Sequence, residues 1–226
     1  NAINYSGNRL VIGFKESSIN GAGSGEVRVY DWDGLVWNQI GQTIAGEAAG
    51  DWFGHSVAIN AIGNKIAIGA PYNDASLSGN TRVGHVRVYD WNGTSWVQSG
   101  SDIDGEAAND WFGSAISMDS TGNKIVIGTP YNDGPFGSIN DNTGHARVYQ
   151  WNGTNWGQMG NDIDGESTGD YFGQSVSINS LGNILAIGGP QNEGNSGNSA
   201  DFRGHTRVFE WNGSNWTQKG QDIDGV

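Results

Sequence analysis

The motif Trp91-Asn92-Gly93-Thr94 returns as Trp151-Asn152-Gly153-Thr154 and as Trp211-Asn212-Gly213-Ser214, and a divergent copy, Trp32-Asp33-Gly34, precedes all three. A second motif keeps the same spacing: Gly69-Ala70-Pro71, Gly128-Thr129-Pro130 and Gly188-Gly189-Pro190. The period is about sixty residues, which is typical of solenoids, propellers and repeat arrays. The chain therefore consists of repeated structural units, and its fold is decided by one of them.

One repeat, residues 51–106, contains four short runs with the composition of β-strands. The second run ends at a proline, which stops strand pairing, and the third alternates apolar and polar residues with period two. Asn92-Gly93 is the strongest short signal for a β-hairpin, because its two residues tolerate positive φ. We expect strands at 53–59, 65–69, 85–91 and 96–98. Helical periodicity is absent, so we predict an all-β fold.

Four antiparallel strands per unit predict a β-propeller of four-stranded blades, with a β-solenoid as the alternative. Phe-Gly begins a repeat only at Phe53-Gly54, Phe112-Gly113 and Phe172-Gly173, so the first copy lacks most of its first strand. We therefore expect the propeller to be part of a larger one or to be completed by another chain. The expected units are an incomplete first blade at 1–50 and blades at 51–106, 107–166 and 167–226, all in one propeller domain.

Composition narrows the possible partners. The net charge is −13, from 24 acidic and 11 basic residues. Such a field repels phosphate backbones and anionic lipid surfaces, so we expect no nucleic-acid partner. No run of apolar residues is long enough to span a bilayer, so we expect no membrane insertion. The chain has no cysteine, which excludes disulfides and thiolate chemistry.

The string GEAAGDWFGHSVA at 46–58, followed by Ile68-Gly69-Ala70-Pro71, resembles the FG-GAP repeat. That repeat builds the seven-bladed propeller of integrin α subunits and of many bacterial and algal surface proteins. The resemblance covers nearly the whole chain in four copies. It implies a non-enzymatic recognition or adhesion module that is extracellular or at the cell surface, with its targeting signal outside this chain.

Many members of the family carry a calcium loop of the Asp-x-Asp-x-Asp-Gly type between the first two strands of a blade. The corresponding segments here, 60–64, 119–123 and 179–183, are shorter and nearly free of carboxylates. Calcium takes six to eight oxygen ligands, several of them charged. The family's calcium sites are therefore not transferred to this chain, and no cofactor is assigned.

The long loops between the second and third strands differ from copy to copy, whereas the turns at the opposite face are uniform. Scaffolds commonly carry their binding residues on such loops. The loops span 72–84, 131–144 and 191–204, and a solvated linker without function is the alternative reading. The candidate partner-binding residues are Tyr72, Asn73, Asp74, Tyr131, Asn132, Asp133, Phe136, Phe202 and Arg203.

An acidic run recurs between the fourth strand of one blade and the first strand of the next. Two interpretations are open: a cation site, possible for calcium, or carboxylates that accept backbone N–H groups and hold a tight turn. The spacing matches no EF-hand loop. The candidate metal ligands are Asp102, Asp104, Glu106, Asp110, Asp162, Asp164, Glu166 and Asp170.

Histidine and arginine also recur once per blade, at His85, His145 and His205 and at Arg28, Arg87, Arg147 and Arg207. One residue per blade is typical of a scaffold role, so we expect hydrogen-bonding histidines and arginines that join neighbouring strands or blades. The tryptophans that flank each hairpin are expected to pack as cross-strand pairs.

Three functions remain open from the sequence. The first is recognition of a protein or glycan through the variable loops. The second is a structural repeat of a large surface or filamentous protein that assembles through strand edges, with self-association through the incomplete first blade. The third is a lectin that stacks sugars on its paired tryptophans.

Overall fold

The computed structural model describes residues 1–74, 81–134, 141–194 and 201–226. Within these residues the chain forms four antiparallel sheets and no α-helix. The all-β propeller fold predicted from the repeats is confirmed. The described residues form no helix that is long and apolar enough to cross a membrane.

Each sheet is one blade, and its strands follow in chain order. Blade 1 contains β1 (Ala2–Ile3), β2 (Arg9–Phe14), β3 (Glu26–Trp32) and β4 (Trp37–Ala45). Blade 2 contains β5 (Ser56–Ile59), β6 (Lys65–Ala70), β7 (His85–Trp91), β8 (Trp96–Gln98) and β9 (Ile103–Asp104). Blade 3 contains β10 (Ala115–Met118), β11 (Lys124–Thr129), β12 (His145–Trp151), β13 (Trp156–Gln158) and β14 (Ile163–Asp164). Blade 4 contains β15 (Ser175–Ile178), β16 (Ile184–Gly189), β17 (His205–Trp211), β18 (Trp216–Gln218) and β19 (Ile223–Asp224).

The sequence located the third and fourth strands of a blade well and the first one poorly. The third and fourth strands of blade 2 have the expected bounds, but β5 begins at Ser56 instead of residue 53. The reason is local: Trp52 and Gly54 have φ of 57° and 88°, outside the extended region. The short β9, which pairs with the start of β7, was not expected.

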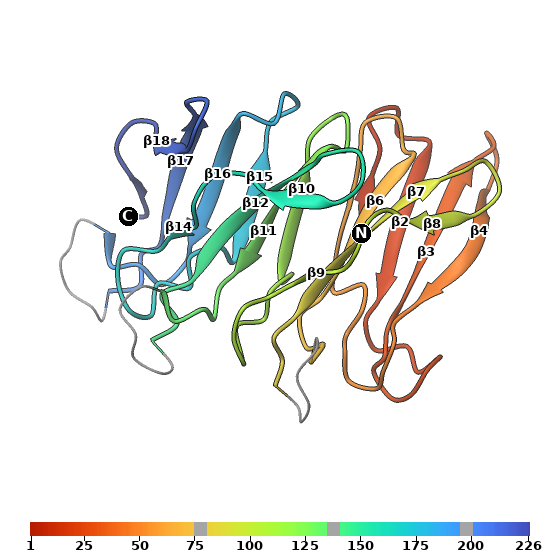
Figure 1. Ribbon diagram of the computed structural model, residues 1–226, viewed down its shortest axis with the longest axis horizontal. Coiled ribbons are helices and arrows are strands. Elements are labelled where there is room, and N and C mark those ends of the chain that lie inside the picture. Colours follow the sequence, from red (N-terminus) through yellow and green to blue (C-terminus); the bar gives the residue numbers. More distant parts are fainter. Residues whose placement is uncertain (75–80, 135–140, 195–200) are drawn as a thin grey trace.

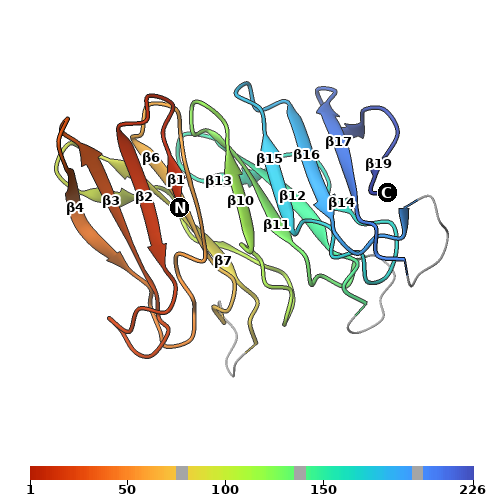
Figure 2. The ribbon, with the colours of Figure 1, turned by 180° about the vertical axis from the view of Figure 1, so that it is seen from behind.

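The four blades stand in a row, with blade 1 at one end and blade 4 at the other (Figure 1). The same order is seen from behind in Figure 2. Neighbouring blades meet mainly through their first two strands: β5 contacts β1 and β2, β10 contacts β5 and β6, and β15 contacts β10 and β11. Sheets that converge at their first strands and diverge at their last are arranged as blades about a propeller axis.

The hydrophobic core lies between the blades, in three clusters that each join two neighbours. Phe53, Phe112 and Phe172 each belong to one cluster, and all three are fully buried. Burying a phenylalanine side chain contributes roughly 1.5–3 kcal/mol. We call each of these boundaries a seam. Because each seam is filled by the Phe-Gly motif of the following blade, that motif is what joins one blade to the next.

Glycines of the preceding blade make room for this motif. A Cβ atom on Gly69 would lie 2.2 Å from the carbonyl oxygen of Gly113, and one on Gly84 would lie 2.2 Å from that of Phe112. No side chain fits at such distances. The Phe-Gly of one blade and the Gly-Ala-Pro glycine of the blade before it are therefore two halves of one contact, which explains why the two motifs recur together.

Candidate functional site

Five aromatic side chains form a continuous row across the seams of blades 2 to 4. Trp52 stacks on Tyr72 with ring centroids 4.0 Å apart, and Tyr72 meets Trp111 edge to face at 4.5 Å. Trp111 contacts Tyr131 at 4.0 Å, and Tyr131 contacts Tyr171 at 5.2 Å. Such separations suit attractive aromatic pairs. We call these five residues the aromatic row.

The row is built from two recurring positions. Tyr72 and Tyr131 directly follow the proline that ends the second strand, in the loops that the sequence singled out. The other three residues directly precede Phe-Gly and have positive φ: 57° at Trp52, 58° at Trp111 and 52° at Tyr171. Bulky side chains rarely adopt this conformation, at a cost of roughly 1–3 kcal/mol. The buried phenylalanine that follows each of them holds the strained residue in place.

Two cations lie over the rings at one end of the row. The Lys15 ammonium lies 4.2 Å from the ring centre of Trp52, and the Arg82 guanidinium lies 4.8 Å from that of Tyr72. Cation–π contacts of this kind are worth about 0.5–1 kcal/mol at exposed sites. In a chain with a net charge of −13, this places positive groups beside a large aromatic surface.

A pocket of 360 Å³ opens beside the middle of the row. It is lined by the rings of Trp111 and Tyr131 and by polar groups of Arg82, Asn109 and Asp133. Asp133 accepts a hydrogen bond from the backbone N–H of Asn142 at 3.3 Å, which fixes one wall. The pocket therefore combines aromatic surface with a guanidinium, a carboxylate and an amide.

The structure places the predicted binding residues in different surroundings. Tyr72 and Tyr131 belong to the aromatic row, and Asp133 lines the pocket. Asn73 and Asn132 are buried and donate hydrogen bonds to Asp51 and Asp110, at 3.0 and 2.9 Å, so their amides hold the loop. Asp74 accepts the backbone N–H of Arg82 at 3.0 Å.

Two further predicted residues lie in the loop of the last repeat and form none of the ring contacts of the row. Phe202 is 64 % exposed, and Arg203 pairs with Asp201 at 2.8 Å. Phe136 lies outside the described residues. Sequence reasoning missed Trp52, Trp111 and Tyr171, although the aromatic residue before the Phe-Gly that begins each repeat was a visible signal.

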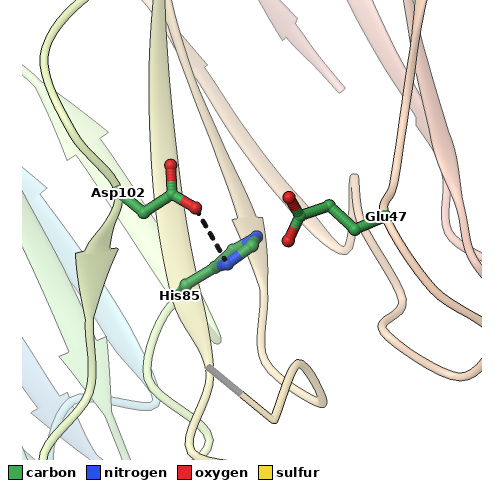
Figure 3. Close-up of side chains that lie close together, drawn as sticks. All are labelled: Glu47, His85 and Asp102. Atoms are coloured by element: carbon green, nitrogen blue, oxygen red, sulfur yellow. Dashed lines mark ion pairs between the residues drawn. The ribbon is translucent and has the colours of Figure 1, made fainter. Parts of the chain in front are cut away.

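The recurring acidic residues lie at the seams, where they meet the recurring histidine and arginine. In blade 2, Asp102 and Glu47 approach His85 from opposite sides (Figure 3). The His85 Nδ1 atom is 3.8 Å from the Asp102 carboxylate. Arg87 donates to Asp102 at 2.8 and 3.0 Å and also pairs with Glu47. Burial, reinforced by the Arg87 charge, lowers the pKa of His85 to about 4, so the imidazole is neutral at pH 7.

Blade 3 repeats the arrangement, with Arg147 bound to Asp162 at 2.7 Å and paired with Glu106. In both blades a resident guanidinium therefore lies between the two carboxylates, where a metal ion would have to displace it. In blade 4, Arg207 is instead held by Gln218 at 2.7 Å. The distances from the Arg207 guanidinium nitrogens to the carboxylate oxygens of Glu166 and Asp222 are 3.6 and 3.8 Å.

The other predicted metal ligands are placed differently. Asp110 and Asp170 are buried and accept hydrogen bonds from backbone N–H groups of the loop and from an asparagine side chain. Burial raises the pKa of Asp110 to about 6. Asp104 and Asp164 lie on the short strands β9 and β14, and burial raises their pKa as well. The predicted ligands thus lie at several seams, and two of them, Asp102 and Glu166, each lie close to a histidine and one further carboxylate.

The paired tryptophans contact each other across every hairpin, at centroid distances of 5.2–5.4 Å. In blades 2 to 4 the second member is buried: Trp96, Trp156 and Trp216 are 2–8 % exposed. Trp32 and Trp37 of blade 1 are more exposed, at 42 % and 38 %. Stacking on a sugar needs an accessible ring face, so the second tryptophan of these hairpins offers little surface for it.

Solved structures with a similar fold include "Kuenenia stuttgartiensis Hydrazine Synthase", with a TM-score of 0.59 and 11 % identity over 99 % of this chain and 47 % of that one. They also include a putative 6-phosphogluconolactonase from Bacteroides fragilis NCTC 9343, with a TM-score of 0.60 and 10 % identity over 99 % of this chain and 53 % of that one. This chain spans about half the length of each. At this identity the likeness concerns the fold alone.

No curated protein is significantly similar to this chain in sequence. The family model described as "FG-GAP repeat" matches residues 37–89, a segment that contains both Phe53-Gly54 and Gly69-Ala70-Pro71. These two motifs are the ones that form the seams. The expected resemblance is thereby confirmed: residues 37–89 match the FG-GAP repeat, within a chain that has the β-propeller fold.

Proposed function

We propose that this chain is a non-enzymatic recognition or adhesion module of an extracellular or cell-surface protein, and that it binds a protein partner through the aromatic row. The continuity of the row over three blades is the observation that carries the proposal. Tyrosine, tryptophan and arginine dominate the binding energy of protein interfaces. Rings held rigidly by their neighbours lose little conformational entropy when a partner binds.

A protein partner fits the row better than a glycan does. Each ring inside the row contacts another ring on either side, at 4.0–5.2 Å. The Trp52–Tyr72 and Trp111–Tyr131 contacts, at 4.0 Å, cover part of the ring faces on which sugars stack. Rings flanked by Arg82 and Lys15 suit a partner that presents carboxylates and apolar side chains.

The placement of the recurring charged groups supports a binding role. Among the described residues, the recurring histidines are buried, and arginines hold the seam carboxylates of blades 2 and 3. These recurring charged groups therefore serve the scaffold. This leaves the surface of the row as the best-supported functional feature.

The proposal is tested by probing an array of secreted and cell-surface ectodomains, and in parallel a glycan array, with the labelled chain. We expect ectodomain hits that Arg82→Glu and Tyr131→Ala weaken about tenfold or more, the loss typical of interface hot spots. Ile62→Glu is the matched control, because Ile62 is 72 % exposed in the turn at the opposite end of blade 2. Binding to glycans alone, or equal losses in the control, would contradict the proposal.

A further inference from the structure

The seam between blades 3 and 4 brings a glutamate, a histidine and an aspartate together. Glu166 follows β14 in the segment that leads into blade 4, His205 begins β17, and Asp222 directly precedes β19. The Nδ1 atom of His205 lies 3.9 Å from Oε2 of Glu166 and 3.8 Å from Oδ2 of Asp222. Ligand atoms of the three residues all lie within 4.8 Å of one another. We call these residues the carboxylate–histidine set.

His205 is buried without a hydrogen-bond partner. Its side chain is 0 % exposed, and neither ring nitrogen has a partner among the described residues. The ring packs edge to face against Phe172, with centroids 5.7 Å apart, which helps to fix its orientation. Buried polar groups in folded proteins are nearly always paired, so such a nitrogen calls for an explanation. A bound metal ion would supply the partner that Nδ1 lacks.

In blades 2 and 3 an arginine occupies the corresponding position. Arg87 donates two hydrogen bonds to Oδ2 of Asp102, at 2.8 and 3.0 Å, and this is the oxygen that faces His85 (Figure 3). Arg147 donates to both oxygens of Asp162, at 2.7 and 2.9 Å. In these blades the guanidinium therefore already satisfies the carboxylate that a metal ion would need.

Arg207 of blade 4 does not take this position. It donates instead to Oε1 of the Gln218 side chain, at 2.7 and 3.0 Å. It approaches Glu166 through Oε1 at 3.6 Å and Asp222 through Oδ1 at 3.8 Å. His205 faces the other oxygen of each carboxylate, Oε2 and Oδ2. A metal ion on the histidine side therefore does not have to displace the guanidinium.

A difference of one residue between the repeats favours the different course of Arg207. Tyr89 and Tyr149, two residues after the arginine, carry hydroxyl groups that hydrogen-bond it in blades 2 and 3. Blade 4 has Phe209 at this position, and the Arg207 guanidinium lies over the Phe209 ring at 5.1 Å. The phenylalanine has no hydroxyl to hold the arginine between the carboxylates.

The two carboxylates of the set repel each other, and a cation would relieve this repulsion. Burial, with the negative charge of Asp222 adding to it, raises the pKa of Glu166 above its usual value, although Arg207 opposes the shift. The side chain of Asp222 is 27 % exposed, close to the 29 % of Asp102 and the 31 % of Asp162. The set is therefore covered to the same extent as its counterparts and differs from them in its chemistry.

We propose that the carboxylate–histidine set is a zinc site that joins blades 3 and 4, and that Phe209 confines the site to blade 4. Zinc binds nitrogen and carboxylate oxygen at about 2.0–2.2 Å, so two ligand atoms at the tetrahedral angle lie roughly 3.3–3.6 Å apart. The observed 3.8 and 3.9 Å require a side-chain shift of about 0.5 Å. Calcium and magnesium prefer sites built from oxygen alone. The three ligands leave the fourth position of a tetrahedral zinc ion to water.

The test measures Zn²⁺ binding to the intact, chelator-treated chain by isothermal titration calorimetry and thermal denaturation. We expect one zinc ion per chain and a melting temperature that rises by about 5 °C or more at a hundredfold excess over Kd. Glu166→Gln and Asp222→Asn keep the shape of partly exposed side chains but remove an anionic ligand. Each should weaken binding about tenfold or more, since even groups that only support a ligand contribute about 10–100-fold.

Glu106→Gln is the matched control. Glu106 holds the equivalent position in blade 3, where it pairs with Arg147. Its variant should bind Zn²⁺ as the native chain does, and Ca²⁺ in tenfold excess should not compete. The zinc site is overturned if no saturable binding is found, if both acid variants of the set bind unchanged, or if Glu106→Gln loses binding equally. Competition by Ca²⁺ would also overturn it.

Phe209→Tyr tests what confines the site to one blade. The variant restores the residue of blades 2 and 3, and its hydroxyl should draw Arg207 back between the carboxylates. We expect weaker Zn²⁺ binding in a chain that remains folded by circular dichroism. Unchanged binding would overturn the role of Phe209. The site shares no residue with the aromatic row, so its failure would leave the proposed partner-binding surface intact.

Discussion

At the scale of single residues, the glycines have two distinct tasks that the sequence does not separate. Gly93 has φ of 98° in a hairpin, with nothing near its missing Cβ atom. Gly84 has φ of 83° at a seam, where a Cβ atom would collide with a backbone carbonyl. Both are needed for backbone conformation, but only the seam glycine is also needed for close approach.

This difference predicts unequal costs for the same substitution. Gly93→Ala should lower the free energy of unfolding by about 1–2 kcal/mol, the cost of a left-handed alanine. Gly84→Ala adds overpacking against Phe112, about 1–3 kcal/mol more. Urea denaturation of both variants measures the difference. Equal losses would show that the seam relaxes around the new methyl group.

The buried histidines predict a pH dependence. The pKa of His85 and His145 is lowered to about 4, first by burial and then by Arg87 or Arg147. Between pH 4 and 6.5 the unfolded chain binds protons that these folded residues do not, so stability should rise with pH through this window. The gain is on the order of 3 kcal/mol per histidine. Asp110 has the opposite effect on stability. Its pKa is raised to about 6 in the folded chain, so between about pH 4 and 6 the folded chain binds a proton that the unfolded chain does not, and stability falls as the pH rises.

The measurement is urea denaturation from pH 4.5 to 7.5 for the native chain and for His145→Gln. Glutamine does not titrate, so the variant should gain less stability as the pH rises. Its curve should therefore be flatter, whatever its stability at pH 7. Curves that run parallel would show that His145 is protonated to the same extent in the folded and unfolded chains.

At the scale of elements, the hairpins were the easiest feature to predict because their signals are local. Asn92-Gly93 fixes the turn, and the period-two pattern of 85–91 fixes the strand before it. The missed elements depend on other parts of the chain. β9 is defined by pairing with β7, and the position of Trp52 is defined by a phenylalanine seated in blade 1. A single-sequence pattern does not contain these contacts.

The hairpins differ in how much they contribute to the core, although their sequences are alike. Trp96 is 2 % exposed and packs into the seam cluster of blades 1 and 2, whereas Trp37 is 38 % exposed. Trp96→Ala should cost about 3–5 kcal/mol and Trp37→Ala less than about 1 kcal/mol. Thermal denaturation of the two variants tests this. Similar costs would mean that the cross-strand pair matters more than the seam.

At the scale of the whole molecule, the repeats predicted the blades but not what joins them. The period gave the number of units and the turn motifs gave their strands. The roles of Phe-Gly and Gly-Ala-Pro became clear only from the contact between consecutive blades. For the same reason the sequence predicted only part of the aromatic row. Tyr72 and Tyr131 lie in the variable loops that were expected to bind a partner. The rings that they contact include residues that precede a Phe-Gly motif, and these were not expected.

A row of blades that contact their neighbours should tolerate shortening at a seam. A chain of residues 1–166 ends after Gly165, removes blade 4 whole and leaves Ile163 as exposed as Ile223 is in the longer chain. We expect it to fold, with a urea m-value of about three quarters of the native one, because m scales with the surface exposed on unfolding.

A chain of residues 1–189 instead keeps β15 and β16 without β17, and its unpaired edge should cause aggregation. Circular dichroism and urea denaturation compare the two. If residues 1–166 were unfolded while the longer chain folded, the blades would form one cooperative unit, and stability would not be a sum of blades and seams.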